Sequence, residues 1–353
     1  MKNSGARTIF RGSEYQRTPR PHKRAIRLHH FSCYDLCRLY GGGLEIIMTN
    51  YTYAAAYVRT LETCMLTDAD MRELMQCNDS AELLQSLEKR GYEGDTLSDA
   101  LENELEKTWQ ICTELCGDDE PMAALMAEND FYNIKAVIKS ALAGRDAGEV
   151  VIRPTRIDVK LLYDLVKTGD FSALNTDFAE VCAQALKIYA ETGDAGRLET
   201  YLDRRCAEVF LSESRCNDFL HGYAELTVLI KNLRIFLRIE DKRQLSIALI
   251  PCDSIDVTLL ENAATKQEAL AAQGFGEFYE LFAESPAKFE HCCENMIADY
   301  IADAKTEFFD FAAVLGYLIG KRTEIRNIRE IASGITFGED AADISERLVK
   351  GYV

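Results

Sequence analysis

The sequence has little of what most enzymes and metalloproteins use for chemistry. It contains five histidines, and only His221 and His291 lie beyond the first 47 residues. It lacks the GxxxxGKS/T loop that cradles nucleotide phosphates. No apolar run reaches the roughly 18 residues that a membrane-spanning helix needs. These absences predict no direct nucleotide binding, no histidine-based catalysis, no membrane-spanning helix and no cofactor.

Basic residues are also scarce. The chain has 40 Lys and Arg against 58 Asp and Glu, a formal net charge of -18 over 353 residues. Residues 1–47 carry nine Lys or Arg and only three Asp or Glu, so the rest of the chain has a net charge of -24. A body this acidic repels phosphate backbones, and the sequence therefore predicts no nucleic-acid partner.

The residues that could carry chemistry are scattered. Twelve cysteines fall at irregular spacings, which predicts reduced and mostly buried thiols. The tripeptide "HCC" at residues 291–293 has no second CxxC or HxxxH nearby, so we predict no metal site there. Carboxylates are spread along helix faces. A hydrolase with paired carboxylates remains a minor alternative to a protein without catalytic residues.

Residues 1–47 differ from the rest of the sequence. They are basic, hold three of the five histidines and show no sustained helical period. One interpretation is a targeting leader. The other is a start codon placed too early, because "MTNYTYAAAYVRTLE" from Met48 reads at once as a helix. We favour the second, treat residues 1–47 as a non-native or disordered N-terminal extension, and exclude them from the predicted fold.

From Met48 onward the apolar residues recur at helical spacing. One predicted helix face alternates steps of four and three and consists of Leu101, Leu105, Thr108, Cys112 and Leu115. Alternating strand patterns are hard to find. The sequence therefore predicts an all-α fold.

Two short motifs recur at a constant period. "NIKAVIK", "NLRIFLR" and "NIREIAS" begin at residues 133, 232 and 327, which are 99 and 95 residues apart. "IDVKLL" at residues 157–162 returns 98 residues later as "IDVTLL", and each copy follows a proline. A fainter version, "LTDADMRELMQ", lies at residues 66–76. This period predicts three similar helical domains, at residues 48–150, 151–249 and 250–353.

The first of these motifs, which we call the asparagine motif, supplies the candidate structural residues. Asn is a mediocre helix former because its amide competes for backbone hydrogen bonds, so its return suggests a shared structural task such as capping a segment or bridging helices. The basic residue two places later is expected to face solvent or reach a nearby acid. The residues singled out are Asn133, Lys135, Asn232, Arg234, Glu324, Asn327 and Arg329.

Several stretches resemble one known family. The segment "GYLIGKRTEIRNIREIASGITFGEDAADISERLVKGYV" is similar to the closing signature of the C subunit of the archaeal and bacterial V/A-type rotary ATPases, a relative of the d subunit of the vacuolar ATPase. The matching positions are Glu324, Asn327, Ile328, Arg329, Gly334, Gly338, Leu348 and Val349. The opening helix agrees through Tyr53, Ala54, Val58 and Arg59, and "DFYNIKAVIKSALAG" agrees from Asp130. The resemblance covers residues 48–353.

The resemblance implies a fold and a function. Members of this family are built from three helical domains around a pseudo-threefold axis, as a funnel. They act as a non-catalytic socket between the central stalk and the membrane proteolipid ring, peripheral on the cytoplasmic face, with one copy in the complex. The implied partners are the central-stalk subunits and the ring, in ATP-driven ion transport or ion-driven ATP synthesis. The alternative is a helical-repeat scaffold for soluble partners without an ATPase role.

The middle repeat departs from the pattern of the other two. Leu229 stands three residues before Asn232, where the other repeats have Asp130 and Glu324. Arg243 also replaces the glycine that follows the other two copies. We therefore expect whatever the acid does to be weaker or differently made in the middle repeat.

Overall fold

The computed structural model describes residues 51–117, 119–145, 151–307 and 310–353. All of them fall in one compact unit, Thr49–Val353. In these ranges every regular element is helical, and the only β-type pairing is an isolated bridge between Cys252 and Ile255. The predicted all-α fold is confirmed. The predictions for residues 1–47 lie outside the described residues.

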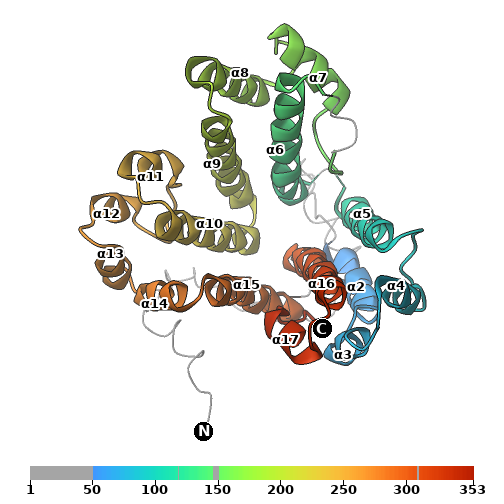
Figure 1. Cartoon of the computed structure of the whole chain (residues 1–353). Helices are drawn as coiled ribbons and strands as arrows, with labels where there is room; N and C mark the ends of the chain where they lie inside the picture. Colours follow the sequence, from blue (N-terminus) through green and yellow to red (C-terminus); the bar gives the residue numbers. More distant parts are fainter. Residues whose placement is uncertain (1–50, 118, 146–150, 308–309) are drawn as a thin grey trace, which may run out of the picture. The chain divides into compact units, whose positions relative to one another are not determined.

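Sixteen α-helices and two short 3-10 helices make up the described chain. They are α2 (Tyr51–Glu62), α3 (Asp68–Leu74), α4 (Ser80–Glu88), α5 (Leu97–Cys116), α6 (Glu120–Leu142), α7 (Val159–Thr168), α8 (Thr176–Thr192), α9 (Ala195–Glu213), η1 (Ser214–Cys216), α10 (Asp218–Arg238), α11 (Lys242–Ala248), α12 (Val257–Asn262), α13 (Lys266–Ala272), α14 (Gly276–Glu284), α15 (Pro286–Ala302), η2 (Asp303–Thr306), α16 (Ala312–Phe337) and α17 (Ala341–Arg347) (Figure 1).

Three long helices carry the three copies of the asparagine motif. Asn133 lies on α6, Asn232 on α10 and Asn327 on α16. Each of these helices packs against a helix of another repeat: α6 against α9, α10 against α15, and α16 against α5 (Figure 1). The last long helix therefore packs on the first part of the chain. In these three pairings the first repeat contacts the second, the second contacts the third, and the third contacts the first.

The apolar core follows the same arrangement. The N-terminal halves of α6, α10 and α16 share one cluster with α2 and α5, which includes Met122, Leu220 and Leu315. The C-terminal half of α6 belongs to a second cluster with α7, α8 and α9, and that of α10 to a third with α11 to α15. The C-terminal half of α16 packs in the fourth cluster with α3, α4 and α5. Both ends of the described chain thus share one core.

The second sequence motif marks the start of a helix. In each copy an apolar residue precedes the N-cap, the cap side chain accepts hydrogen bonds from first-turn N–H groups, and an apolar residue follows four positions after the cap. The three sets are Ile157, Asp158 and Leu162 at α7; Ile255, Asp256 and Leu260 at α12; and Leu66, Thr67 and Met71 at α3. Both apolar residues of each set belong to one core cluster. The faint first copy therefore has the same local structure as the other two.

Candidate functional site

Each asparagine of the motif binds the backbone of a residue farther along the chain. Its Oδ1 accepts the N–H of that residue, and its Nδ2 donates to the carbonyl of the same residue. The pairs are Asn133 with Ile152, Asn232 with Ile250, and Asn327 with Val349, at donor–acceptor distances of 2.7–3.0 Å. We call this two-bond pair the asparagine clamp.

The clamp explains why this position carries Asn. A carboxamide has both a donor and an acceptor in one plane, so it can satisfy the N–H and the C=O of one residue as a neighbouring strand would. Asp cannot donate, and Gln is one methylene longer. Ile152 and Ile250 lie at the starts of the second and third repeats in the sequence, so the first two clamps hold the junctions between repeats.

In the first repeat, the acid before the clamp also binds the next segment. Buried Asp130 accepts hydrogen bonds from Thr155 Oγ1 at 2.6 Å, from the Arg156 backbone N–H at 2.7 Å and from Arg156 Nε at 2.6 Å. Arg156 also reaches Glu213 on α9, at 3.0 Å. Burial acts to lower the pKa of Arg156, but Asp130 and Glu213 outweigh it and raise that pKa. The guanidinium thus lies between two carboxylates and stays charged.

In the third repeat, the corresponding acid binds the first part of the chain. Glu324 Oε2 accepts the Leu66 backbone N–H at 2.6 Å, and Oε1 accepts from Tyr92 Oη and from Lys321 Nζ, the latter at 2.7 Å. Lys321 Nζ also lies 3.0 Å from Glu104 Oε1 on α5. Burial acts to lower the pKa of Lys321, but the two carboxylates raise it overall. Burial and Glu324 both raise the pKa of Tyr92, so its phenol remains a donor.

In the middle repeat, a different residue takes this role. Leu229 belongs to the apolar core. Glu225, four residues earlier on α10, accepts the backbone N–H groups of Asp253 and Ser254 at 3.1 and 3.0 Å and the Ser254 hydroxyl at 2.7 Å. Four residues are about one helical turn, so Glu225 lies on the same face as Leu229. Sequence comparison at fixed spacing missed Glu225, although its distance of one turn was a usable signal.

The three acids each bind a backbone N–H group one or two positions before a helix cap. Asp130 and Glu225 bind the N–H of the residue just before Ile157 and Ile255, the apolar residues that precede the caps of α7 and α12. Glu324 binds the N–H of Leu66, which corresponds to Ile157 and Ile255 themselves and so lies one position nearer the cap of α3. The third repeat thus makes with the first a contact similar to the one that each earlier repeat makes with its own following segment.

The basic residues of the motif differ among the repeats. Lys135 pairs with Asp203 on α9, and Arg234 Nε lies 2.7 Å from Glu290 Oε2 on α15. Arg329 is exposed, and no acid of the described ranges pairs with it. Two of the three basic residues thus bind the neighbouring long helix.

One ion group joins all three long helices. Glu128 of α6 lies 3.8 Å from Lys231 of α10 and 3.5 Å from Arg322 of α16, measured from carboxylate oxygen to the cationic nitrogen. Burial acts to raise the pKa of Glu128, but Arg322 and Lys231 outweigh it and lower that pKa. Because each member comes from a different repeat, this group links the repeats at one point.

Replacing Glu128 with Gln is expected to cost about 1 kcal/mol of unfolding free energy at pH 7, the range of partly exposed ion pairs. Because the folded-state pKa of Glu128 is lowered, its contribution is present above the ordinary value of 4.5 and lost as the pH falls through the folded-state pKa. Urea unfolding of both proteins at pH 7 and below pH 4.5 tests this. Glu106→Gln, on the exposed face of α5, is the control and should show no such pH dependence.

The cysteines are the other potentially reactive groups among the described residues. All ten described cysteines are free thiols. Burial raises the pKa of Cys182, Cys206 and Cys293 to about 12, so these thiols are unreactive at neutral pH. Four of the ten are buried, four are partly buried, and Cys64 and Cys216 are exposed, so the expectation of mostly buried thiols holds only in part.

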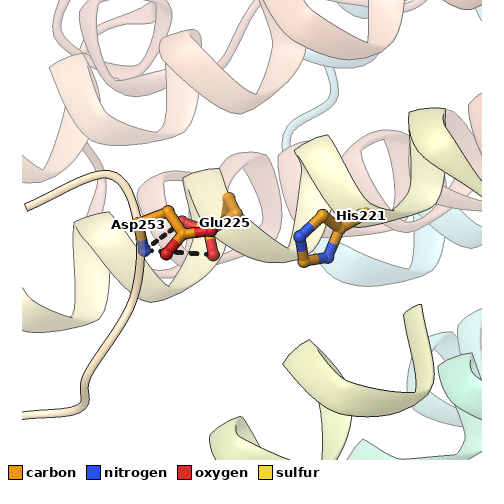
Figure 2. Close-up of side chains that lie close together, drawn as sticks. All are labelled: His221, Glu225 and Asp253. Atoms are coloured by element: carbon orange, nitrogen blue, oxygen red, sulfur yellow. Dashed lines mark hydrogen bonds between the residues drawn. The ribbon is translucent and has the colours of Figure 1, made fainter. Parts of the chain in front are cut away.

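One histidine lies beside carboxylates. His221 and Glu225 on α10 and Asp253 after α11 place one nitrogen or oxygen each within 4.8 Å of one another (Figure 2). Among the described residues this is the one group of His, Cys, Asp and Glu that could hold a metal ion, and the "HCC" residues do not belong to it. The sequence analysis did not single out this group, because Asp253 is 28 residues from Glu225.

None of the described helices is both long and apolar enough to cross a membrane. The contacts define a class of protein: a helical chain in which each copy of the asparagine motif is fastened to a later segment by polar contacts. Residues 54–347 match the ATP synthase (C/AC39) subunit family, and the chain belongs to this family.

Curated relatives agree with the family along most of the chain. A protein of Thermococcus kodakarensis is 26% identical over 330 residues, which cover 84% of this chain and 90% of the relative. One of Haloferax volcanii is 24% identical over 345 residues, with 85% and 98% covered. One of Methanothermobacter thermautotrophicus is 25% identical over 323 residues, with 80% and 83% covered. All three are C subunits of A-type ATP synthases.

Proposed function

We propose that this protein is the non-catalytic rotor subunit of an A/V-type ATP synthase. It forms a socket that seats the central stalk and couples it to the membrane proteolipid ring, peripheral on the cytoplasmic face. The family match along residues 54–347 is the observation that carries this proposal. The three sequence repeats are then three domains arranged as a funnel around the stalk.

The contacts between repeats support this role. A part that transmits torque has to resist shear between its repeats, and close-packed interiors are poorly compressible. Here directional polar contacts add to apolar packing: asparagine clamps at the first two junctions, acids bound to a neighbouring segment, and the one group of Glu128, Lys231 and Arg322 that joins the three long helices. The residues of the asparagine motif accordingly have a structural role, not a catalytic one.

The acidic surface fits partners of opposite charge. The formal net charge of -18 keeps an exposed protein soluble, and it favours basic surfaces on the stalk or on the loops of the ring.

A pull-down tests the proposal. The tagged full-length chain is expressed in its host, recovered from gently solubilised membranes, and the co-purifying proteins are identified by mass. We expect stalk subunits and the proteolipid to co-purify, and the isolated chain to show no ATPase activity. Membranes from a strain without the proteolipid provide the control, and membrane recovery should fail there while the stalk subunits still bind.

Two results would contradict the proposal. Recovery of soluble proteins alone, without stalk or ring, would indicate a helical-repeat scaffold. Turnover of ATP by the isolated chain would indicate an enzyme.

A further inference from the structure

We propose that His221, Glu225 and Asp253 bind a divalent transition-metal ion, which fastens α10 to the segment that precedes α12. This inference rests on the geometry of the middle repeat and does not depend on the proposed function.

The three side chains converge from two parts of the chain. His221 and Glu225 are one turn apart on α10, so they share a face, and Asp253 comes from the segment that Glu225 binds (Figure 2). Their ligand atoms lie within 4.8 Å of one another. Ligand atoms at about 2.1 Å from one ion in tetrahedral geometry lie roughly 3.5 Å apart. The group therefore has to contract by roughly 1 Å, which rotation of the exposed Asp253 side chain allows.

The hydrogen bond on the far side of His221 prepares its ring for a metal. Ser214 Oγ lies 3.1 Å from the Leu211 carbonyl and 3.0 Å from His221 Nδ1. Because the hydroxyl donates its one proton to the carbonyl, it accepts from Nδ1–H, and we assign this tautomer to the neutral ring. The lone pair is then on Nε2, the nitrogen that faces the carboxylates in Figure 2. A ligating histidine is commonly held in this way through its other nitrogen.

The other two repeats show that a cation belongs at this kind of junction. Arg156 lies between Asp130 and Glu213 in the first repeat. In the third repeat, Lys321 lies between Glu324 and Glu104.

The middle repeat also brings two carboxylates together, those of Glu225 and Asp253. Within the described part of the chain, no Lys or Arg side chain forms an ion pair with Glu225 or Asp253. Two adjacent carboxylates repel each other unless a cation lies between them. A bound metal ion supplies this charge in the middle repeat.

Glu225 can bind the metal without releasing the segment. Its Oε2 takes the three shorter hydrogen bonds from Asp253 and Ser254, and Oε1 takes only a 3.3 Å bond from the Asp253 N–H. Oε1 therefore keeps a lone pair for the ion. One imidazole and two carboxylates suit ions such as Mn²⁺ and Zn²⁺.

Binding of Mn²⁺ to the full-length chain tests the proposal, because Mn²⁺ binds thiolates weakly and so avoids the free cysteines. The free ion is counted by electron paramagnetic resonance at pH 7.5. We expect His221→Gln and Asp253→Asn each to lose one site, or to weaken it by roughly tenfold or more. His291→Gln is the matched control and should bind as the wild type does. Binding elsewhere, including residues 1–47, is common to all four proteins and cancels in the comparison.

Thermal unfolding of the wild type with and without Mn²⁺ gives a second readout. Mn²⁺ at about 100 times its Kd should raise the unfolding midpoint of the wild type by roughly 4 °C or more. Asp253→Asn should not lower the metal-free midpoint, because its side chain accepts no hydrogen bond within the described residues and its loss relieves the repulsion from Glu225. Equal Mn²⁺ binding by all four proteins would overturn the proposal. So would the absence of any rise in the wild-type midpoint.

Discussion

Replacing Asn232 with Ala is expected to lower the free energy of unfolding by about 2–5 kcal/mol. The substitution removes both bonds of the middle clamp and leaves the N–H and the C=O of Ile250 without partners. Ile250 is 2% exposed, so water cannot replace the lost amide. Each buried and unpaired backbone group costs about 1–3 kcal/mol. Urea unfolding of the full-length chain, followed by circular dichroism, measures the effect.

The same substitution at Asn133 provides the matched control. Both hydrogen bonds of its clamp are 2.9 Å long, close to the 2.7 and 2.8 Å of the middle clamp, but its partner Ile152 is 37% exposed. Water can reach the groups that Asn133→Ala releases, so this loss should be only about 1–2 kcal/mol. Equal losses at the two sites would contradict burial as the source of the effect. A loss below about 0.5 kcal/mol at Asn232 would show that the clamp does not stabilise the junction.

Replacing Lys321 with Met is expected to cost about 3–5 kcal/mol. Lys321 is 3% exposed, and its ammonium group lies 2.7 Å from Glu324 and 3.0 Å from Glu104. Met fills a similar volume but leaves two carboxylates in a poorly hydrated site without their cation. Loss of the ammonium group should weaken the packing of α16 on α5 and on the segment at Leu66. Lys321 binds Glu104 of α5, and Glu324 binds both Lys321 and the Leu66 N–H.

A double substitution separates the lost charge from the lost packing. Adding Glu104→Gln to Lys321→Met removes one of the two uncompensated charges, so the double variant should be more stable than Lys321→Met alone. If the double variant is less stable than Lys321→Met, the stability lost in Lys321→Met comes from packing and not from the uncompensated charges. The pKa of Lys321 is raised, so its contribution is complete below the ordinary value of 10.5 and is lost only as the pH rises through the folded-state pKa. The difference between wild type and Lys321→Met should therefore be constant between about pH 7 and pH 9.

Lys288→Met is the exposed counterpart. Lys288, in the first turn of α15, pairs with Glu284, the last residue of α14, and both side chains are exposed, so solvent screens the charge. This variant should unfold like the wild type.

These predictions concern the junctions between repeats, which is where the proposed function places mechanical load. A clamp variant that still assembles but couples ATP hydrolysis less well to ion transport would connect stability to that function. Such a result would not depend on the metal inference, since neither Asn232 nor Lys321 belongs to the group of His221, Glu225 and Asp253.

The sequence by itself determined the helices and the repeat. Helix periodicity and caps act over three or four residues, so the face from Leu101 to Leu115 and the caps Asp158 and Asp256 could be read without the fold. The period also located Asn133, Asn232 and Asn327, and the resemblance to the family was visible in separate stretches of the chain.

Only the tertiary structure decided what these residues bind. The clamp partners lie 18–22 residues from their asparagines, beyond the reach of helix periodicity, and the path of the chain between them selects the partner. Glu225 replaces the missing acid of the middle repeat because one helical turn brings it to the same face, which matching at fixed spacing does not detect. The contact of Glu324 with Leu66 joins residues 258 positions apart, so only the packing of α16 on the first helices could reveal it.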